Sequence, residues 1–147
     1  MATIKRFEDL EVWQAARKQC IDIEKLLVEV LCQRNQRLKD QLQGSSGSVM
    51  DNIAEGFEKE NRKEFINFLF HAKASAGEMR SQLIRVSDFG YFNKSIVEPL
   101  IVKSETLSRQ IWAFIVYLKG TNMEGMRHVS EPDQFYAGNN IEPGHEL

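Results

Sequence analysis

A chain of 147 residues, of which 42% are hydrophobic, suits one domain and supplies a core that needs neither metal nor disulfide support. The formal net charge is -2 at pH 7, and from Met1 to Gly120 eighteen Lys and Arg face sixteen Asp and Glu. This near-neutral balance excludes the strongly basic composition of a dedicated nucleic-acid-binding protein.

The first expected helix runs from about Phe7 to about Leu31. Its acidic start, Glu8-Asp9-Leu10-Glu11, suits the positive end of a helix dipole. Apolar residues recur on one face at spacings of three and four: Leu10, Trp13, Ala16, Cys20, Ile23, Leu27 and Val30. We expect a turn near residues 34–36, because an unbroken rod through the next helix would be too long, at about 70 Å, for a domain of this size.

The second expected helix starts near Arg37 and crosses a run of glycine and serine. Composition alone leaves a flexible linker open, since Gly44 and Gly47 each cost about 1 kcal/mol relative to alanine inside a helix. The apolar rhythm nevertheless continues across the run, and a linker has no reason to keep it. Its members are Leu38, Leu42, Val49 and Ile53. We therefore expect the helix to pass through the run and to stop at Gly56.

The third expected helix runs from Asn61, an N-cap with an acid three residues later, to Phe89-Gly90. The turn near Lys59 is short, so the second and third helices must be antiparallel neighbours, with residue 45 opposite about residue 74. Two runs of small residues would then meet and let the backbones approach closely. They are Gly44, Ser45, Gly47 and Ser48 on one helix and Ala72, Ala74, Ser75 and Ala76 on the other.

The fourth expected helix starts near Glu98, because Pro99 is tolerated in a first turn, and it ends at Gly120. From Thr121 onwards one Arg faces five acids and no apolar period persists. The sequence therefore predicts an all-α protein. Residues 1–120 form an antiparallel up-down-up-down four-helix bundle, and residues 121–147 form an irregular acidic tail.

Cysteine and hydropathy patterns predict a cytoplasmic protein. Cys20 and Cys32 would lie about 18 Å apart in one helix, too far for a disulfide between them. The N-terminal residues 1–6 lack the apolar run of a signal peptide, and no stretch of 18 apolar residues occurs. We expect a soluble, cytoplasmic protein with no membrane partner.

No motif for catalysis, cofactor binding or metal binding is found. Hydrolase and Walker motifs are absent, and the Glu-x-x-His spacing occurs only at Glu142 and His145 in the tail. Glu55 should lie near the start of the third helix, where a capping role is favoured over acid–base catalysis. We expect no enzymatic activity, no cofactor and no metal. A structural polar network is expected at a bundle edge or subunit seam, formed by Asn52, Glu55, Ser75, Glu78 and Gln82.

Basic residues gather in two places. Lys59, Arg62 and Lys63 cluster at the turn between the second and third helices, and Lys73 and Arg80 share a helix face at heptad spacing. Phosphate attraction depends on such cations lying on one surface. An ordinary solvated helix surface explains them as well, so a nucleic-acid site and a solvated face both stay open.

Several motifs carry a resemblance to a known family. They are Phe7 to Gln14, Asn52 to Gly56, Lys63 to Phe65 with Phe68-Leu69, Ser75 to Glu78 with Gln82-Leu83, and Gly90-Tyr91. In this order they resemble the 23S rRNA intervening-sequence protein family over about residues 5 to 120. Where family members often carry a basic pair, this chain has Gln43-Gly44, and Met50 stands where a proline is common.

The resemblance implies an antiparallel four-helix bundle and a ring-like homo-oligomer of five subunits, without enzymatic activity. It also implies a relation to the accessory proteins of diversity-generating retroelements, which partner a reverse transcriptase and nucleic acid. Two hypotheses follow. The first is a non-enzymatic, homo-oligomeric adaptor that engages RNA or DNA, with or without a protein partner, through basic helix faces. The alternative is a structural or protein-interaction oligomer that has no nucleic-acid partner.

Overall fold

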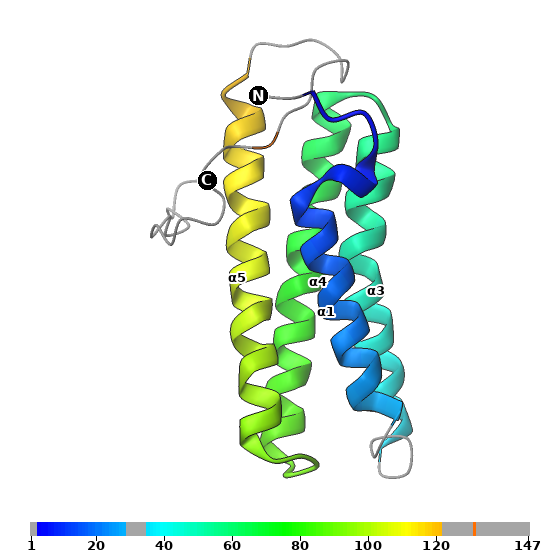
Figure 1. Cartoon of the computed structure of the whole chain (residues 1–147), viewed down its shortest axis with the longest axis vertical. Coiled ribbons are helices and arrows are strands. Elements are labelled where there is room, and N and C mark those ends of the chain that lie inside the picture. The colour runs from blue at the N-terminus through cyan, green and yellow to red at the C-terminus, as the bar shows by residue number, and fades with distance from the viewer. Residues whose placement is uncertain (1–2, 29–34, 122–130, 132–147) are drawn as a thin grey trace.

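The computed structural model describes residues 3–28, 35–121 and 131. Four antiparallel helices pack side by side as a bundle (Figure 1), and no strand occurs within these residues. They are α1 (Glu11–Leu26), α3 (Gln36–Glu58), α4 (Arg62–Asp88) and α5 (Lys94–Lys119), preceded by the 3-10 turn η1 (Phe7–Asp9). The contacts of α4 with α3 and α5 are the most extensive, and those between α1 and α5 are the sparsest. The all-α bundle expected from the sequence is confirmed.

The first helix begins at a later residue than expected. Residues from Phe7 form a 3-10 turn, and α1 begins at Glu11 because Leu10 between them has extended backbone angles, φ -70° and ψ 123°. Leu10 is fully buried, and the Phe7 ring meets Trp13 edge-on at 5.2 Å. Cys20 is a free thiol. Leu31, the expected end of this helix, and Cys32 lie outside the described residues. Of the turn expected at residues 34–36, residue 34 also lies outside them, Asn35 is non-helical, and Gln36 already begins α3.

Helix α3 runs through the glycine and serine run, as the apolar rhythm predicts. The Asn35 side chain caps it by accepting a hydrogen bond from the Leu38 N–H at 3.0 Å. Ser45 and Ser46 are buried, whereas Gly44 is exposed and a Cβ added there would meet no atom within 4 Å. The serines therefore lie at the helix contacts, and the expected packing of these glycines against α4 is wrong.

The register between α3 and α4 differs by about one turn from the expected one. The Ser48 and Ser75 hydroxyl oxygens lie 3.0 Å apart, and Ser45 donates to Gln82 Oε1 at 2.6 Å. Helical side chains lean towards the N-terminus of their own helix and reach about one position back. The side chains of α3 lean away from the connecting turn, and those of α4 lean towards it. Each residue of α3 therefore meets a residue of α4 that lies further along the chain than the one level with it, and the offsets of the two helices add.

Gly56 does not end its helix. It is buried inside α3, which continues to Glu58, and a Cβ at Gly56 would lie 2.5 Å from Phe68 Cβ and 2.9 Å from Phe65 Cδ2. The glycine thus allows α4 to approach closely just before the turn. Glu60 closes the turn with a φ of 51°. Asn61 then caps α4 as expected, its side chain accepting from the Glu64 N–H at 3.1 Å.

Helix α5 starts at Lys94, four residues before the expected start. Asn93 caps it by accepting from the Ser95 N–H at 3.2 Å, and Pro99 lies in the second turn. A proline there removes only the hydrogen bond to the Ser95 carbonyl, and Val97 beside it is fully buried and anchors the turn. The helix ends at Lys119 with Gly120 as its C-cap, as the sequence predicts.

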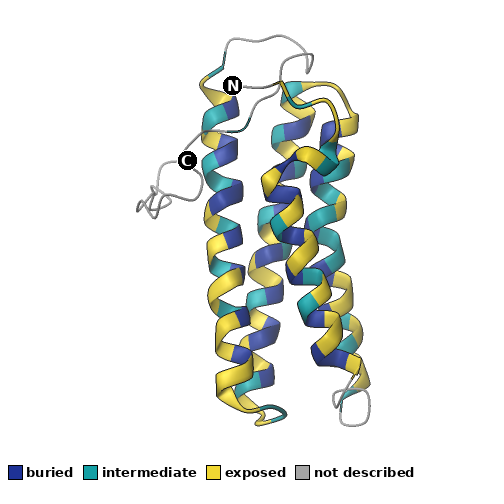
Figure 2. Cartoon of the chain, viewed as in Figure 1, coloured by how far each residue is buried: buried dark blue, intermediate teal, exposed yellow. Residues whose placement is uncertain are grey.

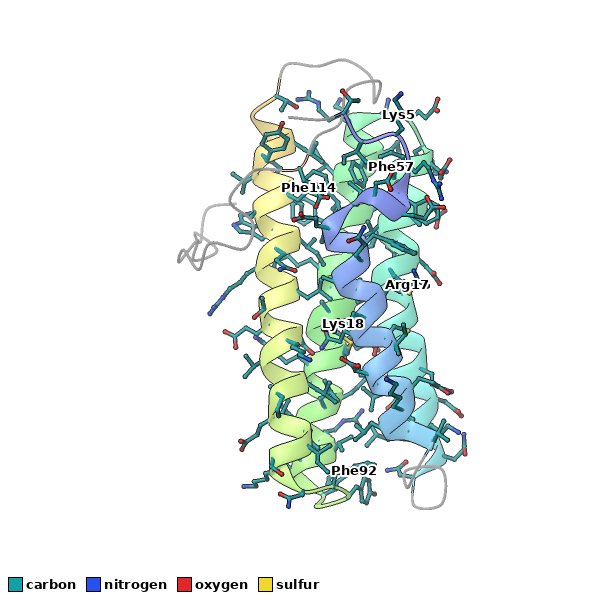
Figure 3. The ribbon with its side chains drawn as sticks, in the orientation of Figure 1. Lys5, Arg17, Lys18, Phe57, Phe92 and Phe114 are labelled. Carbon is teal, nitrogen blue, oxygen red and sulfur yellow. The ribbon has the colours of Figure 1, made fainter. Side chains whose placement is uncertain are left out.

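Buried side chains form one continuous core along the bundle axis (Figure 2). At one end three phenylalanine rings meet edge to face: Phe65 lies 6.0 Å from Phe57 and 5.4 Å from Phe114. Figure 3 shows Phe57 and Phe114 at the same end of the molecule. Across residues 3–28 and 35–121, no helix combines the length and the apolar character that crossing a bilayer requires.

Candidate nucleic-acid interface

The three basic residues at the turn between α3 and α4 have different surroundings. Lys59 Nζ lies 5.7 Å from the centre of the Phe68 ring. Arg62 donates to the carbonyl oxygens of Leu118, at 3.2 Å, and of Thr121. Its guanidinium therefore binds the end of α5 and is largely engaged within the chain. Lys63 is exposed and forms no ion pair with the described residues.

The other two basic residues lie on the flank of α4 that faces α5. Arg80 lies 3.9 Å from a carboxylate oxygen of Glu105 on α5, and Glu105 also accepts from Arg109 at 2.7 Å. Lys73 lies two turns before Arg80 on the same flank and has no ion pair within the described part of the chain. Two arginines thus share one carboxylate, which leaves an excess of positive charge here.

Aromatic rings continue this surface. Phe70 of α4, which is 39% exposed, lies 6.2 Å from the half-buried Trp112 of α5. Lys119 Nζ lies 5.1 Å from the centre of the Phe70 ring. Four cations and two aromatic rings therefore lie along the seam between the two helices.

We call this surface the α4/α5 face. It consists of Phe70, Lys73, Arg80, Arg109, Trp112 and Lys119, with Glu105 as the carboxylate among them. Along α5 it spans from residue 105 to residue 119, about 21 Å. Sequence reasoning missed the residues on α5, although Glu105, Trp112 and Lys119 follow one another at intervals of seven. That spacing, which matches Lys73 and Arg80, places the three residues on one face of α5.

The expected polar network lies on the other flank of α4, against α3. Gln82 accepts from Ser45 and donates to Glu78 at 3.1 Å. The Asn52 amide donates to the Ser48 hydroxyl at 2.9 Å, which in turn meets Ser75. These bonds satisfy the polar groups at the contact between the helices.

The side chain of Glu55 takes no part in this network. It is exposed on α3 and makes no hydrogen bond or ion pair with the residues that the structure describes. The end of α4 that it was expected to cap is capped by Asn61. Among the described residues no group of His, Cys, Asp and Glu could hold a metal ion.

One residue of the tail reaches back to the bundle. The N-cap of α1 is Leu10, which supplies no side-chain hydrogen bond. Instead the Glu131 carboxylate accepts from the backbone N–H groups of Glu11 and Val12, the latter at 3.1 Å. Burial raises the pKa of the Glu131 carboxyl above its ordinary value, and these two donors offset the rise only in part.

Replacing Glu131 with glutamine is expected to reveal a pH-dependent contribution to stability. Because burial raises the pKa of Glu131 in the folded state, the folded protein binds this proton more tightly than the unfolded chain. The contribution of Glu131 is therefore full below its ordinary pKa of about 4.5 and falls as pH rises through the raised value. Urea unfolding of the wild type and Glu131→Gln between pH 4 and pH 7 measures it as the difference between the two. A difference that stays constant or grows with pH contradicts the assignment.

Comparisons with known proteins support the bundle and identify its family. A crystal structure of a protein of unknown function from the S23 ribosomal protein family of Bacteroides thetaiotaomicron VPI-5482 has the same fold. Its TM-score is 0.65, at 22% identity over 71% of this chain and 97% of that chain. No curated protein matches the sequence. The model of the family described as 23S rRNA-intervening sequence protein matches residues 8–113, in line with the resemblance seen in the sequence. The chain therefore belongs to the 23S rRNA-intervening sequence protein family.

Proposed function

We propose that this protein is a non-enzymatic, homo-oligomeric adaptor that binds single-stranded RNA or DNA through the α4/α5 face. The observation that carries the proposal is the presence of four cations and two aromatic rings along one seam, with Glu105 as the carboxylate among them. Proteins that bind single strands combine a positively charged track for the backbone with aromatic side chains on which bases stack.

The two components of the face have different roles in this proposal. Lys73 has no ion pair within the described residues, and the arginines around Glu105 exceed its charge, so phosphates can approach. Phe70 and Trp112 offer ring surface to bases, and stacking on such rings contributes about 1–3 kcal/mol per base. Because stacking accepts every base, we expect little sequence preference.

Exposed apolar side chains on the same two helices, α4 and α5, support the homo-oligomeric part of the proposal. Ile84 is 43%, Val102 61% and Val116 46% exposed. A copy of the chain that packs against α4 and α5 would remove this apolar surface from water. The same residues favour the second candidate function, a structural oligomer that buries this face against another copy and binds no nucleic acid.

Reversing two charges of the face is expected to weaken nucleic-acid binding about tenfold at low salt, because two phosphate contacts become repulsive. The variant is Lys73→Glu with Arg109→Glu. A matched control, Arg37→Glu with Lys94→Glu, makes the same change in net charge at exposed sites on α3 and at the start of α5. Fluorescence anisotropy with a labelled 20-nucleotide RNA and its DNA equivalent measures the affinities. Equal losses in the two variants would contradict a site on the α4/α5 face.

Measuring the oligomeric state of the same proteins distinguishes the two candidate functions. Light scattering coupled to gel filtration gives the oligomeric state of the wild type and of an Ile84→Glu, Val116→Glu variant. The proposal expects an oligomer that also binds nucleic acid. If the wild type binds no nucleic acid at low salt and this variant no longer oligomerises, the adaptor proposal is wrong. The structural oligomer is then the function that the data support.

A further inference from the structure

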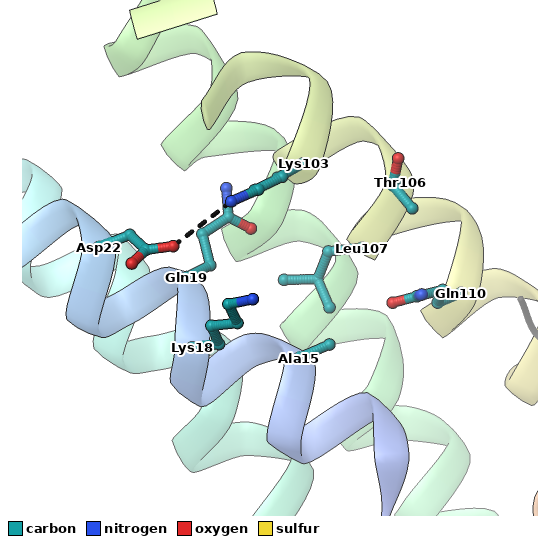
Figure 4. A pocket seen from close by; sticks show the side chains of 8 residues that line it. All are labelled: Ala15, Lys18, Gln19, Asp22, Lys103, Thr106, Leu107 and Gln110. Atoms are coloured by element: carbon teal, nitrogen blue, oxygen red, sulfur yellow. Dashed lines mark ion pairs between the residues drawn. The ribbon is translucent and has the colours of Figure 1, made fainter. Parts of the chain in front are cut away.

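The sparse seam between α1 and α5 leaves an open groove (Figure 4). A cavity of about 200 Å³ lies between Ala15 and Gln19 of α1 and Leu107 and Gln110 of α5. A second hollow of about 370 Å³ shares Asp22 and Lys103 with it and continues past Leu26 to Ile96. Together they form what we call the α1/α5 groove, which extends over about 21 Å from residue 110 to residue 96.

The groove has an apolar floor and a basic rim. Ala15, Leu100 and Leu107 line its floor. Lys103 lies 3.5 Å from Asp22. The rim lysines that have no ion pair within the described residues are Lys18 and Lys25. The rim therefore carries uncompensated positive charge.

One polar side chain at the groove can form a hydrogen bond with an occupant. Gln110 is only 7% exposed, and its amide makes no hydrogen bond to the part of the chain that the structure describes. Figure 4 shows this side chain extending from α5 towards the groove. No buried side-chain nitrogen or oxygen atom of the described residues lacks a hydrogen-bond partner, so the Gln110 amide is open to the groove, where an occupant can form a hydrogen bond with it.

The chain itself leads to one end of this groove. Arg62 holds the carbonyl oxygen of Thr121 beyond the end of α5, and Glu131 is bound at the first turn of α1. Ala15, at the upper end of the groove, is one helical turn beyond Glu11. Glu131, the last described residue of the chain, is therefore held about one helical turn from the upper end of the groove.

We propose that residues 132–147 of this chain dock in the α1/α5 groove. This segment carries Asp133, Glu142 and Glu146 and no Lys or Arg, so its charge is opposite to that of the rim. Its Phe135, Tyr136 and Ile141 supply apolar side chains for the floor. Sixteen residues span up to about 50 Å when extended, more than twice the length of the groove.

Tethering favours this occupant over a free molecule. A segment joined by a short connection has an effective concentration in the millimolar range, so weak contacts are enough to hold it.

Site-specific photo-crosslinking of the full chain tests the proposal. A photoreactive residue at Thr106, which is exposed on the groove side of α5, is expected to crosslink to peptides within residues 132–147. The same residue at Asp51, exposed on α3, is the control and is expected to give none. Mixing isotopically labelled and unlabelled chains distinguishes crosslinks within one chain from those between chains. Crosslinks from Thr106 only to another copy, or none to the tail, would overturn the proposal.

Charge exchange tests the attraction between the rim and the tail. Lys18→Glu with Lys25→Glu is expected to lower the crosslink yield about fivefold, because it turns attraction into repulsion. Adding Asp133→Lys, Glu142→Lys and Glu146→Lys should restore the yield, while Arg37→Glu with Lys94→Glu should leave it unchanged. Far-UV circular dichroism confirms that each variant folds. The proposal would be contradicted if the two lysine substitutions left the crosslink yield unchanged. It would also be contradicted if the three tail substitutions did not restore the yield.

Discussion

The Phe65→Ala variant is expected to lose about 3–5 kcal/mol of unfolding free energy, the range seen when a buried phenylalanine is truncated. Phe65 is fully buried and its ring meets Phe57 and Phe114 edge to face. It also packs beside Gly56, where α3 and α4 approach most tightly. Its removal therefore leaves a cavity among three helices, and the rigid backbone near the turn limits how far the cavity can collapse.

Phe70→Ala is the matched control, because it makes the same chemical change on the same helix at a ring that is 39% exposed. We expect it to cost at most about 1 kcal/mol, since little apolar area returns to water. It should weaken nucleic-acid binding, whereas stability should remain close to the wild type. Urea unfolding of both variants at equal protomer concentration makes the comparison. Similar stability losses in the two variants would contradict the assignment of Phe65 to the core.

Gly56→Ala is expected to destabilise the protein by about 2 kcal/mol, although alanine is the better helix former by about 1 kcal/mol. The new Cβ would lie 2.5 Å from Phe68 Cβ, an atom fixed to the backbone of α4. Rotation of a side chain cannot relieve that contact. The two helices must move apart, which loosens the packing of the neighbouring phenylalanines.

Gly44→Ala and Gly47→Ala are the controls on the same helix. A Cβ at either position meets no atom within 4 Å, so each is expected to stabilise the monomeric fold by about 0.5–1 kcal/mol. Thermal or urea unfolding separates the three variants. Stabilisation by Gly56→Ala, or destabilisation by both controls in monomeric protein, would show that the close approach of α3 and α4 lies elsewhere.

Much of the fold follows from pattern. The apolar rhythm from Leu38 to Ile53 predicts that α3 passes through its glycines, and Asn61 and Gly120 mark helix ends where the structure has them. One glycine and one proline mislead the prediction of helix ends, because the effect of each residue depends on its surroundings in the fold. Gly56 is explained by the rings of α4, and Pro99 is accommodated by a turn that Asn93 and Val97 hold.

The candidate interface is less accessible to sequence reasoning. Basic residues on one helix are visible in the sequence, but whether they are free depends on the other helices. Arg62 is engaged by the end of α5, and Arg80 is paired across the seam with Glu105. The contribution of Trp112 appears only when α5 is placed beside α4.

The contact of Glu131 with α1 lies beyond any local rule. It joins residues about 120 positions apart, and the helix it caps has an apolar N-cap, Leu10, that signals no such partner. An unsatisfied helix start is the only hint in the sequence, and it does not say which carboxylate will satisfy it.

Mapping RNA crosslinks on the wild-type protein tests the central proposal most directly. A single-stranded RNA carrying 4-thiouridine is bound at low salt, irradiated and digested, and the attached peptides are identified by mass spectrometry. Crosslinks are expected on peptides that contain Phe70 or Trp112, and their yield is expected to fall steeply as salt is raised. No crosslinked peptide at low salt, or crosslinks confined to α1 and α3, would contradict the proposal.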